Sequence, residues 1–123
     1  MRAYDAGRIF TDPAAALAGL ATEGLNLLGC RDVVRAADID VDVSHVGEAY
    51  GRPTPAATEA IALLARTEGI LCDPVYSGKA LAGLVTDARS GRIPAGSTVV
   101  FWHTGGWHAL FEPGYAAAQL AFH

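Results

Sequence analysis

Residues 67–84 read TEGILCDPVYSGKALAGL, and residues 103–106, at the end of an apolar run, read HTGG. In the first stretch a turn at Asp73-Pro74 leads directly into an amphipathic helix, and in the second a glycine turn follows a strand-like segment. Turns of this kind present hydroxyl and backbone N–H groups to small ligands at the carboxyl edge of an α/β sheet. The two segments therefore predict both the fold class and the place where a ligand binds.

The sequence before these segments alternates between helical and strand-like patterns. Asp12-Pro13 opens a helix that Gly29 stops, because Pro suits the first turn and Gly the C-terminal end. Residues 38–46 (DIDVDVSHV) alternate acidic and apolar residues, which is typical of a strand exposed on one face. Thr54 is a suitable N-cap for a helix over residues 55–68, which Gly69 closes.

The second half predicts two more short strands separated by a helix. Residues 70–72 form a buried strand, Ser77 starts a helix that Gly91 ends, and residues 98–102 form a strand buried on both faces. The order helix–strand–helix–strand–helix–strand implies an α/β fold, a parallel sheet with helices on both faces. About three strands are few for such a sheet, so we expect a partial domain. We treat residues 1–123 as one domain, with 113–123 as a tail.

Composition restricts the classes of partner. The 123 residues carry a net charge of -4 without a Lys/Arg cluster, which argues against nucleic acid. No apolar run approaches the roughly 20 residues that span a bilayer, and the first ten residues lack the apolar region of a secretory signal. Cys30 and Cys72 lie far apart, which favours free thiols in a reducing compartment. We expect a cytoplasmic protein without membrane partners.

Several polar residues of the turns are candidates for a site. Tyr76 and Ser77 follow Pro74, Tyr50 lies in the breaker-rich loop GEAYGRPTP, and the turn 104–106 is Thr-Gly-Gly. Each also has a structural interpretation: a turn tyrosine, a helix N-cap, a surface-loop tyrosine and an ordinary glycine turn. Glycines in such a turn let the backbone approach a ligand closely.

Other catalytic arrangements find little support. His103 and His108 have no acidic partner at metal-ligand spacing, and no GxSxG nucleophile motif occurs. Lys79 is the only lysine, and a carbonyl cofactor needs a lysine amine for covalent attachment. Because Lys79 lies in the first turn of a helix, we favour a structural or substrate-facing role for it.

Taken together, the motifs resemble the C-terminal third of D-cysteine desulfhydrases and 1-aminocyclopropane-1-carboxylate deaminases. These are pyridoxal-phosphate (PLP) enzymes of the tryptophan-synthase β-subunit type. The resemblance covers about residues 20–111. The matching segments, in order, are Tyr50-Gly51-Arg52-Pro53-Thr54, Glu59-Ala60-Ile61, Ala65-Arg66-Thr67-Glu68-Gly69-Ile70-Leu71, Asp73-Pro74-Val75-Tyr76-Ser77-Gly78-Lys79-Ala80, His103-Thr104-Gly105-Gly106 and Ala109-Leu110-Phe111.

The resemblance implies roles for five residues. Tyr76 matches the active-site tyrosine beside the substrate, and Tyr50 matches the second tyrosine of the site. Thr104 matches a residue near the pyridine nitrogen of the cofactor, and Ser77 and Gly105 belong to the same cofactor-binding surroundings. Family members that open the cyclopropane ring carry Glu and Leu where this chain has Ser77 and Thr104, whereas desulfhydrase-like members carry Ser or Thr.

This pair of hydroxyl residues favours the desulfhydrase activity. A carboxylate near the pyridine nitrogen would keep it protonated and deepen the electron sink, and hydroxyls do so less. Expulsion of a thiolate needs less help than cleavage of a carbon–carbon bond. The implied reaction is β-elimination of D-cysteine to pyruvate, hydrogen sulfide and ammonia, with 1-aminocyclopropane-1-carboxylate deaminase activity as the alternative. The substrate would be a small amino acid and the intact enzyme a homodimer.

The sequence also departs from the family. The family's Schiff-base lysine and its GSGGT-like phosphate loop lie upstream of the matching region, and neither occurs here. His108 stands where the family commonly has Pro. We therefore expect the isolated chain to be inactive, and it is either paired with a separately encoded N-terminal portion or a non-catalytic remnant. A small module that binds an anionic metabolite at the turn 104–106 is a further alternative.

Overall fold

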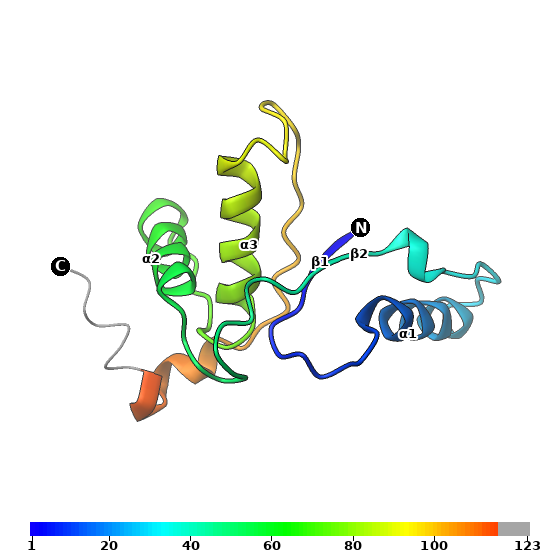
Figure 1. Cartoon of the computed structure of the whole chain (residues 1–123), viewed down its shortest axis with the longest axis horizontal. Coiled ribbons are helices and arrows are strands. Elements are labelled where there is room, and N and C mark those ends of the chain that lie inside the picture. Colours follow the sequence, from blue (N-terminus) through cyan, green and yellow to red (C-terminus); the bar gives the residue numbers. More distant parts are fainter. Residues whose placement is uncertain (116–123) are drawn as a thin grey trace.

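The structure, a computed structural model, describes residues 1–115. Its helices and strands alternate only up to residue 68, and within residues 1–115 no strand follows that point, contrary to the predicted alternation (Figure 1). In order they are strand β1 (Arg2–Tyr4), helix α1 (Pro13–Leu27), 3-10 helix η1 (Ala36–Asp38), strand β2 (Asp40–Asp42), helix α2 (Pro55–Glu68), helix α3 (Ser77–Arg89) and 3-10 helix η2 (Trp107–Phe111).

The two strands form a parallel pair. Arg2 lies opposite Asp40 and Tyr4 opposite Asp42, and α1 makes the crossover between the strands. Helix α1 contacts β2 while α3 contacts β1, and Figure 1 shows α1 on one side of the strand pair and α2 and α3 on the other. This confirms the expected α/β class with a parallel sheet and helices on both sides.

The expected helix ends are confirmed because each depends on local chemistry. Asp12 accepts a hydrogen bond from the N–H of Ala15 at 3.0 Å, and Thr54 accepts one from the N–H of Ala57 at 3.1 Å. Both helices have Pro in the first turn, as the missing N–H of Pro allows. Gly69 ends α2 in the left-handed conformation, with φ of 68°.

The hydrophobic core lies between α2 and α3. Its buried members are Ala60, Ile61, Cys72, Leu81 and Ala82, and the partly buried Phe101 packs against them. Because Cys72 belongs to this core, the Asp73-Pro74 turn that follows it is fixed against the two helices.

The two strands predicted over residues 70–72 and 98–102 are not formed. Neither segment pairs with another strand within residues 1–115. The expectation that residues 98–102 are buried on both faces is wrong, since Val100 is 81% and Trp102 82% exposed. A strand forms only beside another strand that accepts its backbone hydrogen bonds, and the described chain places none there.

The strand predicted over residues 38–46 is shorter than expected, and its partner was not foreseen. Only Asp40–Asp42 pairs, with β1 at the start of the chain. Arg2 of β1 forms ion pairs with Asp40 and Asp42, at 2.8 Å for the latter, which explains the acidic residues of this strand.

The end of the described chain folds back onto the loop before α2. The hydroxyl of Tyr115 donates a hydrogen bond to the carbonyl of Gly51 at 2.8 Å. Of the tail predicted over 113–123, residues 116–123 lie outside the described residues. No helix within residues 1–115 is both long and apolar enough to cross a membrane.

Candidate functional site

Two tyrosines from distant parts of the chain meet. Tyr50 belongs to the loop between β2 and α2, and Tyr76 immediately precedes α3. Their hydroxyl groups share a hydrogen bond, and their ring centroids lie 5.9 Å apart. The hydrogen bond with Tyr50 raises the pKa of Tyr76, because it favours the protonated phenol. Both rings remain partly exposed, so a ligand can reach the paired phenols.

The turn that carries Tyr76 is organised by the carboxylate of Asp73, which is fully buried. It accepts hydrogen bonds from the backbone N–H groups of Val75, Tyr76 and Ser77 at 2.8, 2.7 and 2.8 Å. The N–H groups of Tyr76 and Ser77 lie at the start of α3, where backbone N–H groups have no partner within the helix. Asp73 therefore fixes the backbone from which the Tyr76 side chain projects.

Ser77, the first residue of α3, lies buried against the same carboxylate. Its hydroxyl donates to Asp73 Oδ1 at 2.5 Å and accepts from the Asp73 backbone N–H at 3.0 Å. The Ser77 hydroxyl is thus engaged within the turn. Its role beside a cofactor stays a prediction.

The HTGG turn packs against the Asp73 turn. His103 Nδ1 accepts a hydrogen bond from Gly105 N–H at 3.2 Å, which leaves the ring proton on Nε2 to donate to the carbonyl of Leu71 at 2.8 Å. A Cβ atom at Gly106 would lie 2.6 Å from Asp73 Oδ1, and Gly106 has φ of 91°. Only glycine allows this approach.

The predicted site residues thus fall in three neighbouring segments. Tyr50 and Tyr76 touch directly, and Ser77 and the HTGG turn both contact Asp73. The side chain of Thr104 is exposed at the surface of its turn. The sequence interpretation missed the central role of Asp73, although an Asp just before a helix is a known signal for side-chain bonding to the first N–H groups.

The side chain of the single lysine is buried and hydrogen-bonded to the backbone. Lys79 is fully buried, and its Nζ donates to the carbonyls of Val46 at 2.6 Å and Ala49 at 3.4 Å. Burial lowers the pKa of Lys79, and the charge of Asp73 opposes this effect. The amine is therefore not presented to a ligand.

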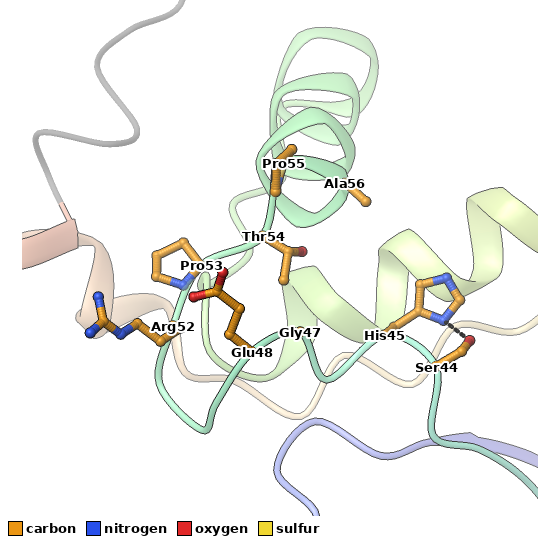
Figure 2. A pocket seen from close by; sticks show the side chains of 9 residues that line it. All are labelled: Ser44, His45, Gly47, Glu48, Arg52, Pro53, Thr54, Pro55 and Ala56. Atoms are coloured by element: carbon orange, nitrogen blue, oxygen red, sulfur yellow. Dashed lines mark hydrogen bonds between the residues drawn. The ribbon is translucent and has the colours of Figure 1, made fainter.

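Two hollows flank the loop that carries Tyr50. The smaller, about 250 Å³, lies beside the paired tyrosines and is mostly apolar. The larger, about 500 Å³, is an open groove between residues 44–48 and 52–56 and contains none of the predicted site residues; Figure 2 shows His45 at one end and Arg52 and Glu48 at the other. Small-molecule pockets occupy about 300–1,000 Å³, and the hollow beside the tyrosines is smaller than this range.

Across residues 1–115, no group of three or more His, Cys, Asp or Glu side chains is arranged to hold a metal ion.

Known proteins match most of the chain. The profile of a family described as pyridoxal-phosphate dependent enzyme matches residues 4–105. The crystal structure of an ACC deaminase homologue is 33% identical and superimposes with a TM-score of 0.74. The match covers 97% of this chain and 34% of the homologue, so this chain spans about a third of the homologue's length.

Proposed function

This chain belongs to the pyridoxal-phosphate dependent enzyme family, and on that premise we propose that it forms the wall of a cofactor site facing the ring and the substrate. The observation that carries the proposal is the meeting of the Tyr50 and Tyr76 phenols beside the HTGG turn, which Asp73 joins to them. When bound, the cofactor supplies an electron sink for carbanion chemistry. The phenols supply hydroxyl groups that hold a proton where the substrate would lie.

The residues present fit the side of the site that faces the ring and the substrate, but they include neither the lysine that would bind the cofactor covalently nor the loop that would bind its phosphate. Covalent attachment needs a free lysine amine, and the only lysine, Lys79, is buried with its Nζ bonded to two carbonyls. The sequence also contains no GSGGT-like phosphate loop. We propose that both elements come from a further polypeptide segment of the same enzyme, either in the same protein or separately encoded.

For the reaction, we favour β-elimination of a small amino acid of the D-cysteine type to pyruvate, hydrogen sulfide and ammonia. Ser77 and Thr104 place hydroxyls, not a carboxylate, at the positions expected near the pyridine nitrogen, and expulsion of a thiolate needs the less strongly activated ring. The likeness to an ACC deaminase homologue supports the alternative, deamination of 1-aminocyclopropane-1-carboxylate.

The first test adds PLP to the isolated chain, followed by borohydride reduction and mass spectrometry. Lys79 and the N-terminal amine are the only amines, so the N-terminus is an internal reference. We expect no reduced adduct on Lys79, because its amine is inaccessible. A stable adduct on Lys79 would contradict the proposal that the lysine for cofactor attachment comes from another polypeptide segment.

The second test assays the complete assembly, with a family polypeptide that carries the lysine and the phosphate loop. We expect sulfide release from D-cysteine to exceed ammonia release from 1-aminocyclopropane-1-carboxylate. Tyr76→Phe should lower kcat by about 100-fold or more, since positioned proton transfer contributes at least that factor. Thr67→Ala, which removes an exposed hydroxyl on α2, is the control. Unchanged kcat in Tyr76→Phe would refute the catalytic assignment.

A further inference from the structure

We propose that Lys79 is a positioning residue whose buried ammonium holds the loop between β2 and α2, so that the phenol of Tyr50 meets that of Tyr76. The use assigned to the tyrosines rests on the proposed function. The contact between Lys79 and the loop is a property of this chain and can be tested without cofactor or substrate.

Both hydrogen bonds of Lys79 go to carbonyls of the loop that carries Tyr50. Its Nζ bonds the carbonyl of Val46, where the loop leaves the core, and that of Ala49, the residue directly before Tyr50. Hydrogen bonds from a charged donor are about twice as strong as those between neutral groups. The ammonium thus restrains the short segment that sets the direction of the Tyr50 side chain.

Two hydrogen bonds connect the loop between β2 and α2 with the start of α3. Tyr76 and Lys79 lie one helical turn apart at the start of α3, while Ala49 and Tyr50 are neighbours in the loop. One contact is the hydrogen bond between the phenols, and the other is the bond from Lys79 to Ala49. The bond from Lys79 holds the loop just before Tyr50, and the bond from Tyr115 to Gly51 holds it just after, so the loop is fixed on both sides of Tyr50.

Packing alone does not account for a lysine at this position. Burying an ammonium group costs several kcal/mol, and a hydrocarbon side chain of similar volume is often as good for stability. Like the charged Asp73, Lys79 is nevertheless fully buried. Its particular contribution is the bonding of carbonyls in a loop that has no helix or strand of its own.

The test follows the titration of Tyr76 by NMR in protein labelled with ¹³C-tyrosine. Tyr50→Phe removes the phenol contact and defines the uncoupled Tyr76 pKa. We expect Lys79→Met to lower the pKa of Tyr76 toward that value, because Tyr50 leaves its partner. Arg89→Met, which removes an exposed positive charge from the same helix, should leave the titration unchanged. A residue that only stabilised the fold would not shift Tyr76 within the folded protein.

A folded Lys79→Met protein that keeps the wild-type Tyr76 titration would overturn the proposal. If Lys79→Met does not fold, ¹³C-lysine labelling of the wild-type chain gives a single lysine spin system. We expect cross-peaks from the Lys79 side chain to Ala49 or Tyr50, and their absence would overturn the proposal as well. An inactive assembly with these NMR results intact would count against the proposed function alone.

Discussion

The Asp73 carboxylate accepts hydrogen bonds from three backbone N–H groups and from the hydroxyl of Ser77. It also lies against Gly106 of the HTGG turn. One side chain therefore contacts two segments that the sequence alone presents as separate motifs. The types of residue at the site could be predicted from sequence. Their dependence on one buried carboxylate could not, because it arises from the approach of a turn about 30 residues further along the chain.

Replacement of Asp73 by Asn should lower the free energy of unfolding by about 3 kcal/mol, because an amide has one acceptor oxygen and leaves buried N–H groups without partners. Urea unfolding measures this change. Asp12→Asn is the matched control, since Asn caps a helix as well as Asp, and it should change stability by less than about 0.5 kcal/mol. Equal effects of the two substitutions would show that Asp73 is an ordinary cap.

Tyr4 should make the stability of the protein sensitive to alkali. Burial, together with the hydrogen bond to Asp87, raises the pKa of Tyr4 from the ordinary 10 to about 12. The folded state thus favours the neutral phenol, so its stabilising effect is complete below pH 10 and is lost as the pH rises toward 12. Urea unfolding between pH 8 and 11.5 should show a steeper loss for the wild type than for Tyr4→Phe. Parallel curves would contradict this.

Among the elements, the helices were predictable and most of the strands were not. The ends of α1 and α2 follow from Asp12, Thr54 and Gly69, whose effects reach only a few residues. A strand instead depends on a partner distant in sequence. The pairing of β1 with β2 therefore went unseen, and residues 98–102 have strand-like composition without a strand.

Helix α3 can approach β1 only because residue 83 is glycine. A Cβ atom there would overlap the ring of Tyr4. Gly83→Ala should lower the free energy of unfolding by about 1–3 kcal/mol despite the better helix propensity of Ala, because overpacking displaces the ring. Thermal or urea unfolding tests this.

Gly19→Ala in α1 is the matched control for Gly83→Ala. No atom lies within 4 Å of a Cβ atom built at Gly19, so alanine should raise stability by up to about 1 kcal/mol. The opposite signs separate packing from propensity. Stabilisation by Gly83→Ala would show that the Tyr4 ring of β1 moves aside at little cost in free energy.

For the molecule as a whole, the order of motifs in the sequence predicts the family, and the match to the pyridoxal-phosphate dependent enzyme family confirms it. The proposed division of the cofactor site follows from the sequence, which contains neither a GSGGT-like phosphate loop nor a lysine other than Lys79. The sequence favoured a structural or substrate-facing role for Lys79, and its burial in the structure decides for the structural one.

Both tryptophans of the chain, Trp102 and Trp107, lie in the exposed stretch that follows Val100. Indole emission moves to shorter wavelength when water is removed from around the ring. Binding of any polypeptide that covers this stretch should therefore shift the intrinsic fluorescence to shorter wavelength. The two tryptophans thus report on assembly without an added dye.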